Sequence, residues 1–302
     1  MVEQDGPACA FVPGHVTGFF SSHPDEDPER AGSRGAGLTL TDGVAVEVTP
    51  AEDAEMRLDG DSITVEPVAR VLDALSVSAR VTATTDLPLG AGFGVSGAMA
   101  LGTALAANEA FDRRLSENDL ITIAHEAEVL SGTGLGDVVA QARGGVPIRL
   151  EPGGPRHNRL DGVPAGTRVE YLTFGELSTE SVLSGDTERL TEAGLESLST
   201  LVEEPTLPTF AYVSRRFARE AGLLTDPVRE VIEDVSDAGG EASMAMLGHT
   251  VFALGTGLSD AGYDPTICHT HAAGATLLAD EPRRDSRPPW QSPPRANNAG
   301  DL

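Results

Sequence analysis

Apolar and polar residues alternate along three stretches near the start of the chain, a pattern typical of strands with one buried face. Residues 8–14, ACAFVPG, predict a short strand that ends at its Pro-Gly pair. Residues 37–49 alternate on both sides of Asp42-Gly43, a pair favoured in tight two-residue turns, and therefore predict a β-hairpin. A third strand is expected at residues 75–83, LSVSARVTA, which leads towards a glycine-rich loop.

Helical patterns follow this glycine-rich loop. Residues 96–111 are mostly strong helix formers, and residues 118–132 have the apolar spacing of a second helix. Ser116 and Asp119 are spaced as a capping box, which predicts where the second helix begins. A glycine turn, a short helix and a double glycine are then expected within residues 132–145, followed by a strand with the sequence VPIRL.

The pattern changes in the second half of the chain. Residues 151–158, EPGGPRHN, are rich in proline and glycine and predict a boundary between two lobes. Residues 281–302 are polar and proline-rich without periodicity, so we expect them to be disordered. Between them we expect a strand at 169–174, helices at 209–223 and 226–240, and two strands joined by a turn at 244–255. The sequence thus predicts an α+β protein with domains at 1–155 and 156–280 and a disordered tail.

Composition narrows the classes of function. The chain of 302 residues has 47 acidic and 21 basic residues, which gives a formal net charge of −26 at pH 7. Such a charge repels phosphate backbones and anionic membrane surfaces, so neither a nucleic acid nor a membrane is expected as a partner. The sequence contains no lysine, and its acidic residues are spread along most of its length, as in proteins of salt-loving archaea.

The cysteines and apolar runs indicate a cytoplasmic protein. Cys9 and Cys268 lie far apart and form no C-x-x-C pattern, so neither a zinc site nor a disulfide framework is expected. The sequence CHTH at 268–271 has no second cluster at zinc-finger spacing and predicts no metal site. No apolar run of about 18 residues occurs, and the N-terminus lacks the basic segment of a signal peptide.

The stretch PLGAGFGVSGAMAL at 88–101 carries the strongest chemical signal. Gly92 to Gly97 match the dinucleotide fingerprint G-x-G-x-x-G, but no strand ending in an acidic residue follows about 20 residues later. A serine-hydrolase elbow fails because Ala98 stands where glycine is required, and a Walker-type loop needs a lysine. A plain tight turn needs fewer glycines. We therefore favour a cradle in which backbone N–H groups at the start of a helix bind a phosphate chain.

This loop resembles the central signature of the GHMP kinases, the superfamily of galactokinase, homoserine kinase and mevalonate kinase. Their pattern P-x-x-x-G-[LF]-G-S-S-A corresponds here to Pro88 through Ala98. FVPGHV resembles their N-terminal signature, although His15 stands where mevalonate kinase has lysine, and AHEAEVLSGTGLGDVVAQ resembles a third motif. The C-terminal glycine-rich motif is reduced to AMLGHT. The resemblance implies a two-lobed α+β fold, with an N-terminal lobe like domain 2 of ribosomal protein S5 and a ferredoxin-like C-terminal lobe.

The resemblance also implies ATP and Mg²⁺ as cofactors and gives roles to individual residues. The phosphate-binding set is Pro88, Gly90, Gly92, Gly94, Ser96, Gly97 and Ala98. Ser96 and Glu128 are expected to ligate Mg²⁺, and both join Asp137 as catalytic residues. Asp137 is expected to face the acceptor hydroxyl as a base or orienting group. Simpler roles stay open, because Ser96 and Asp137 can cap helices and Glu128 can be a solvated acid.

Several stretches are similar to the archaeal pantoate kinase family in particular. They are PGHVTGFFSSH, GSRGAGLTL, LPLGAGFGVSGA and TGLGDVVAQARGGVPIRL. The resemblance implies phosphorylation of (R)-pantoate to (R)-4-phosphopantoate in archaeal coenzyme A biosynthesis. Arg149, unusual in an apolar strand, is the first candidate to bind the substrate carboxylate and Arg34 the second, although an outward-facing arginine is equally compatible with the pattern. His15 and Ser22 are expected to donate hydrogen bonds to the same ligand.

Two other functions stay open at this point. One is a different kinase of the superfamily, acting on mevalonate or homoserine. The other is a non-catalytic regulatory protein that binds a nucleotide with the same loop. The sequence leaves the number of subunits open, and a homodimer is compatible with it.

Overall fold

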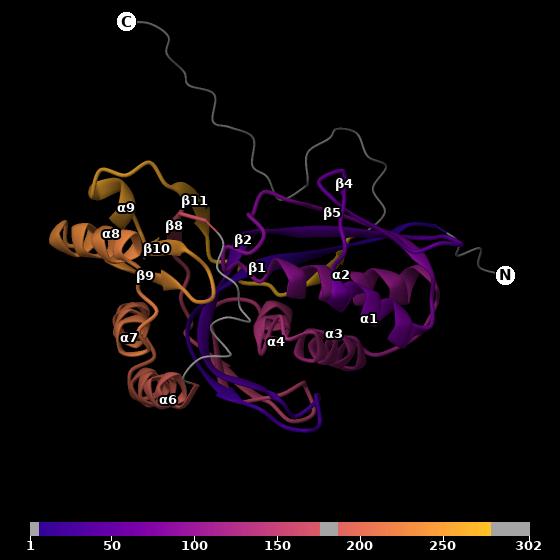
Figure 1. The fold of residues 1–302 in the computed structure, drawn as a ribbon, viewed down its shortest axis with the longest axis horizontal. Coiled ribbons are helices and arrows are strands. Elements are labelled where there is room, and N and C mark those ends of the chain that lie inside the picture. Colours follow the sequence, from indigo (N-terminus) through magenta and orange to yellow (C-terminus); the bar gives the residue numbers. More distant parts are fainter. Residues whose placement is uncertain (1–5, 176–186, 279–302) are drawn as a thin grey trace, which may run out of the picture.

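The computed structural model describes residues 6–175 and 187–278, which fold into two β-sheets with helices packed against them (Figure 1). The tail expected at 281–302 lies outside these described residues. Within the described residues, no helix is long and apolar enough to cross a membrane.

The first sheet contains most of the N-terminal half of the chain. Its order is β12-β1-β2-β5-β3-β4, and β2 also pairs with β6, which in turn pairs with β7. Its strands are β1 (Ala8–His23), β2 (Gly32–Pro50), β3 (Glu55–Leu58), β4 (Asp61–Ser62), β5 (Ala79–Thr85), β6 (Pro147–Glu151), β7 (Arg159–Gly162) and β12 (Thr276–Leu278).

The long strands β1 and β2 correct two sequence predictions. The predicted hairpin at 37–49 is wrong, because β2 passes straight through Asp42 and Gly43, and neither residue has the positive φ that such a turn requires. A Cβ atom at Gly43 would lie 2.4 Å from the carbonyl oxygen of Val12, so glycine is needed there for the close approach of the strands. The predicted end of the first strand is also wrong, because β1 continues through its Pro-Gly pair to His23.

Four helices, α1 to α4, lie together below the first sheet in Figure 1. They are α1 (Glu66–Leu75), α2 (Val95–Ala110), α3 (Glu117–Ser131) and α4 (Asp137–Arg143). The predictions of α2, α3 and α4 are confirmed, including the capping box of Ser116 and Asp119. The sequence analysis missed α1, which ends at Leu75, so the strand predicted from residue 75 begins only at β5.

The second sheet has the order β11-β8-β10-β9, and helices α6 to α9 lie beside it at the left of Figure 1. The elements are β8 (Arg168–Thr173), α6 (Thr187–Glu203), α7 (Leu207–Glu220), α8 (Asp226–Asp237), β9 (Glu241–Ala245), β10 (Thr250–Leu254), α9 (Gly257–Asp260) and β11 (Thr266–His269). β7 follows the proline-rich residues 151–158 but pairs with β6, and β12 returns to pair with β1. The domain limits at 155 and 280 stay a prediction.

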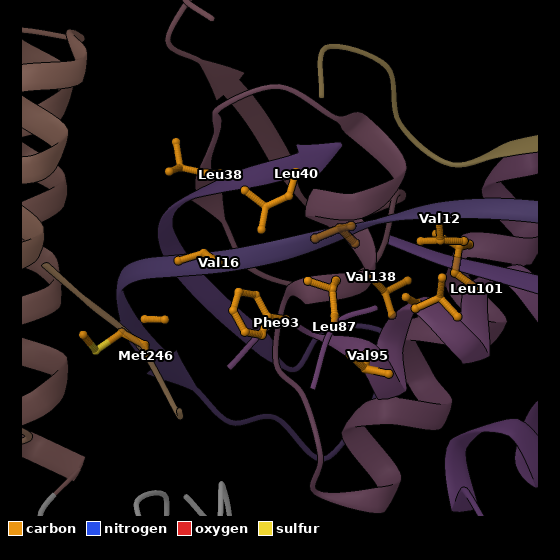
Figure 2. Packing of buried hydrophobic residues seen from close by; sticks show 14 of the residues in the cluster. Val12, Val16, Leu38, Leu40, Leu87, Phe93, Val95, Leu101, Val138 and Met246 are labelled. Atoms are coloured by element: carbon orange, nitrogen blue, oxygen red, sulfur yellow. The ribbon is translucent and has the colours of Figure 1, made fainter. Parts of the chain in front are cut away.

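Buried apolar side chains join the two halves of the molecule. Figure 2 shows Val12 and Val16 of β1 packed with residues of β2, α2 and the glycine loop, and Met246 approaching from the second sheet. Helix α2 lies close to the first sheet, because a Cβ atom at Gly102 would lie only 2.6 Å from the side chain of Val46. This packing fixes the N-terminus of α2, and with it the glycine-rich loop, between the two sheets.

Candidate active site

The glycine-rich loop connects β5 to α2 and has the backbone of a tight cradle. Gly90, Gly92 and Gly94 have φ angles of 74°, 90° and 63°, a region that favours glycine. Pro88 and Gly90 are exposed, and Gly92 and Gly94 are half-buried. Gly94 is the N-cap of α2, so the backbone N–H groups of the first helical turn have no partner within the helix. These donors form the positive end of the helix dipole.

Contacts from other elements hold this loop from one side. Three of its carbonyl oxygens accept hydrogen bonds. The Ala91 carbonyl accepts from Thr250 Oγ1 at 2.8 Å, and the Gly94 carbonyl accepts from Gln141 Nε2 at 2.9 Å. The Phe93 carbonyl accepts from the backbone N–H of His15 at 2.9 Å. The β9–β10 turn packs on the loop so closely that a Cβ atom at Gly248 would lie 1.9 Å from the carbonyl oxygen of Ala91. The carbonyl groups of the loop therefore face the rest of the protein. This arrangement favours backbone N–H groups of the loop that point away from it, where a ligand can accept their hydrogen bonds.

Asp137 begins α4 directly after a glycine, and its carboxylate meets a buried histidine. His15 Nδ1 lies 2.6 Å from Asp137 Oδ1, and the Asp137 side chain is 21% exposed. Burial lowers the pKa of His15 more than Asp137 raises it, so the imidazole is neutral and donates its Nδ1–H. Burial by itself would raise the pKa of Asp137, but the His15 hydrogen bond and the charge of Arg149 lower it overall. Asp137 is therefore an ionised carboxylate.

Glu128 of α3 lies beside the start of α2 and is almost fully buried. Ser96 Oγ donates to its Oε2 at 3.3 Å, whereas its Oε1 has no hydrogen-bond partner. Burial, reinforced by the charge of Asp137, raises the pKa of Glu128 to about 7. A Cβ atom at Gly134 would lie 2.3 Å from Glu128 Oε2, so the glycine turn leaves room for this carboxylate. A solvated role for Glu128 is excluded by its burial.

These oxygen atoms fit a magnesium ion. Mg²⁺ takes oxygen ligands and uses only one or two protein carboxylates. The unpartnered Oε1 of Glu128 and the neighbouring Ser96 hydroxyl supply such oxygen atoms. Among residues 6–175 and 187–278, no cluster of three or more His, Cys, Asp or Glu side chains is placed to hold a metal. This range contains the CHTH sequence at 268–271. Ser96 is not the N-cap of α2, because Gly94 occupies that position.

Arg149 of β6 is one of the largest fully enclosed side chains in the protein. It is 2% exposed, and its Nε and Nη1 atoms have no hydrogen-bond partner. Burial lowers its pKa to about 10, while Asp137 acts in the opposite direction. The outward-facing orientation is therefore excluded. Since a buried, unpaired guanidinium is costly, its free donors indicate a place for an anionic ligand.

A pocket brings these groups together. It is lined by Thr17, Phe20, Ser33, Leu135, Gly136, Asp137, Arg149 and Leu247. Thr17 Oγ1 lies 3.4 Å from His15 Nδ1, so the histidine is adjacent to the pocket through both Thr17 and Asp137. The pocket therefore has a cationic group, an anionic group and hydroxyls beside an apolar wall.

Two residues predicted to bind substrate lie outside this pocket. Arg34 Nη2 donates to Glu151 Oε2 at 2.6 Å, and its strand register pairs it with Ser21 rather than with pocket residues. The backbone N–H of Ser22 donates to the Thr191 hydroxyl of α6 at 3.3 Å. The structure therefore brings Arg149 and His15 to Asp137 but not Arg34 or Ser22.

Of the eight lining residues, the sequence analysis gave a site role only to Asp137 and Arg149. It missed the other six, namely Thr17, Phe20, Ser33, Leu135, Gly136 and Leu247. Thr17 and Ser33 lie within stretches similar to pantoate kinases but carry no motif of their own. Leu247 belongs to the reduced motif AMLGHT, and its φ of 65° is a signal that only the structure gives.

Comparison with known proteins identifies the family. Residues 63–145 match the family model described as the GHMP kinases N terminal domain. The pantoate kinase of Methanocaldococcus jannaschii is 34% identical over 251 residues, which are 81% of this chain and 91% of that protein. The pantoate kinase of Thermococcus kodakarensis is also 34% identical, over 81% of this chain and 86% of that protein. The chain belongs to the pantoate kinase family of the GHMP kinases.

Solved structures agree with this membership. A phosphotransferase related to the CoA biosynthesis pathway superposes with a TM-score of 0.82 and 29% identity, over 90% of this chain and 99% of that one. A homoserine kinase from Cytophaga hutchinsonii has a TM-score of 0.65 at 18% identity, over 92% of this chain and 99% of that one, and shows the shared fold alone. The predicted superfamily, its two-lobed α+β fold and the resemblance to the pantoate kinase family are confirmed.

Proposed function

We propose that this protein transfers the terminal phosphoryl group of ATP to the primary hydroxyl of pantoate, using Mg²⁺. It is a phosphotransferase with an alcohol group as acceptor, as its family membership and its pantoate kinase relatives indicate. The observation that supports the acceptor best is the buried Arg149, whose unpartnered donors share a pocket with the carboxylate of Asp137. Pantoate carries a carboxylate at one end and a primary hydroxyl at the other, which matches this pair of charges.

The glycine-rich loop is the proposed site of the phosphate chain. The N–H groups at the start of α2 and the flexible backbone of Gly90, Gly92 and Gly94 provide donors without a lysine. The assigned set is Pro88, Gly90, Gly92, Gly94, Ser96, Gly97 and Ala98. Ser96 and Glu128 would hold Mg²⁺, which would neutralise charge on the phosphate oxygens when bound.

Asp137 is the proposed orienting group for the acceptor. Its lowered pKa makes it a weak base but a permanent hydrogen-bond acceptor, which suits a phosphoryl transfer that depends mainly on positioning. The neutral His15 donates to Oδ1 and fixes the carboxylate, so that Oδ2 can accept the hydrogen bond of the attacking hydroxyl. The hydroxyl proton passes to this carboxylate as the acceptor oxygen bonds to the γ-phosphorus of ATP and the bond from that phosphorus to the β–γ bridging oxygen breaks, which releases ADP.

Arg149 is the proposed partner of the substrate carboxylate. The N–H groups on Nε and Nη1 have no other partner, so each is free to donate a hydrogen bond to an anionic ligand. The same cation disfavours the ammonium group of homoserine near this end of the pocket. Mevalonate also has a carboxylate and a primary hydroxyl, so it is the most informative competing acceptor.

A coupled ADP-release assay at high salt tests the proposal with pantoate, mevalonate and homoserine offered separately. High salt screens the self-repulsion of a chain with net charge −26. We expect ADP release with pantoate only, and none when Mg²⁺ is removed by a chelator. Release with mevalonate or homoserine instead would change the acceptor. Release with none, while ATP still binds, would favour the non-catalytic regulatory alternative.

A further inference from the structure

We infer that Leu247, in the β9–β10 turn, makes this site selective for an acceptor that carries two methyl groups next to its primary alcohol, on the carbon bonded to the CH₂OH group. This inference rests on the proposed function, because it concerns the side of the pantoate molecule that Arg149 and Asp137 leave uncontacted.

The backbone of Leu247 is strained for a leucine. Its φ is 65°, in the left-handed region that glycine or asparagine occupies more readily than a branched apolar residue. The turn is held in place, because the Met246 N–H donates to the carbonyl of Thr17 at 2.9 Å and Gly248 packs against Ala91. A strained residue at a ligand site is retained where its side chain has a use. In this left-handed conformation, Leu247 lines the pocket.

The pocket is divided by chemistry. Arg149 and Asp137 supply its charges, whereas Phe20, Leu135 and Leu247 form an apolar wall. We place the carboxylate of pantoate at Arg149 and its primary hydroxyl at Asp137. The quaternary carbon of pantoate is bonded directly to the carbon that bears the primary hydroxyl, so it lies between these two charged groups. Its two methyl groups are the large apolar part of the molecule. The apolar wall is the surface of the pocket that can remove these methyl groups from water.

A matched pair of acceptors isolates this contribution. 2,4-Dihydroxybutanoate keeps the carboxylate and both hydroxyls of pantoate and lacks only the two methyl groups. We expect the wild-type protein to prefer pantoate by at least about 10-fold in kcat/KM, from the burial of two methyl groups. In Leu247→Gly the preference is expected to fall by about 5-fold, mainly because KM for pantoate rises, with little change for 2,4-dihydroxybutanoate.

Two further variants control the experiment. Leu247→Asn keeps a residue that tolerates a positive φ but replaces the apolar surface, and the same loss of preference is expected. Leu195→Ala alters a leucine of α6 that is 39% exposed and outside the pocket, so the preference should not change. Because Leu247→Gly relieves backbone strain while losing a half-buried side chain, we expect its Tm to shift by no more than about 4 °C.

The outcomes separate the inference from the proposed function. Wild-type turnover of pantoate together with an unchanged preference in folded Leu247→Gly and Leu247→Asn would overturn the role of Leu247 and leave the proposed function standing. Equal use of both acceptors by the wild-type protein would do the same. No turnover of pantoate by the wild-type protein would overturn both. If Leu247→Gly does not fold, the preference measured for Leu247→Asn decides the question.

Discussion

The Nδ1 atom of His15 lies 2.6 Å from Oδ1 of Asp137, although 122 residues separate them along the chain. His15 is fully buried on β1, and Asp137 begins α4 at the edge of the pocket. Since burial keeps the imidazole neutral, His15 acts as a fixed hydrogen-bond donor to the carboxylate. The histidine thus helps to keep the Asp137 carboxylate ionised and in one orientation.

Removing this donor is expected to change how activity depends on pH. In His15→Ala the pKa of Asp137 rises, because its burial is no longer offset by the hydrogen bond. The acid limb of kcat/KM against pH should therefore move to higher pH, and kcat should fall about 10-fold. His15→Asn, whose amide can still donate, should recover part of both. A profile that coincides with the wild-type profile would show that His15 only fills space.

Loss of the carboxylate itself should separate chemistry from nucleotide binding. Asp137→Ala is expected to lower kcat by about 10² to 10⁴-fold, because the acceptor hydroxyl is no longer oriented. Binding of ATP, measured by calorimetry without an acceptor, should persist, because the N–H groups of the glycine loop are unaffected. Asp161→Ala, at an exposed aspartate of β7, is the matched control and should behave as wild type. Full turnover in Asp137→Ala would remove Asp137 from the mechanism.

Substitutions of Arg149 and Arg34, the two arginines that the sequence analysis proposed as substrate-binding residues, are expected to change KM for pantoate to different extents. Arg149→Ala should raise KM for pantoate by about 10- to 100-fold with a smaller effect on kcat, because a charge-assisted pair with the carboxylate is lost. Arg34→Ala should leave KM close to the wild-type value, because Arg34 is paired with Glu151 outside the pocket. Steady-state kinetics on both variants provides the test. Similar KM values for the two variants would contradict the assignment of Arg149.

Local signals in the sequence predicted those features of the fold and the site that are formed within one segment. The glycine-rich loop, the capping box at Ser116 and the placement of Asp137 at the start of a helix all depend on neighbouring residues. The Asp42-Gly43 pair misled the prediction, because its glycine serves a close strand contact in β2 and not a turn. Turn propensity does not distinguish these two uses of glycine.

Long-range packing decides the remainder of the site. Arg149 enters the pocket because β6 pairs with β2 opposite Gly35, whereas Arg34, the neighbouring residue on β2, points to the other face. Leu247 reaches the pocket only because the second sheet packs against the glycine loop. Sequence periodicity can indicate which face of a strand is buried, but not which other element covers it.

The carboxyl group of Glu128 should give the metal-free protein a distinct pH dependence of stability. Its pKa is about 7 in the folded protein and 4.5 when unperturbed, so between these values the folded state binds more protons than the unfolded state. The favourable contribution is therefore fully present below about pH 4.5 and is lost as pH rises through 7. The total loss is about 3 kcal/mol in the free energy of unfolding.

Glu128→Gln cannot titrate, so its stability relative to wild type should improve as pH rises through this window. Urea unfolding at high salt in metal-free buffers, with Glu192→Gln as an exposed control, measures the difference. Excess Mg²⁺ favours the ionised carboxylate and should reduce the wild-type loss at high pH without affecting Glu128→Gln in the same way. Parallel pH curves for wild type and Glu128→Gln would show that Glu128 is already ionised in the folded protein, and the electrostatic account of its burial would then be wrong.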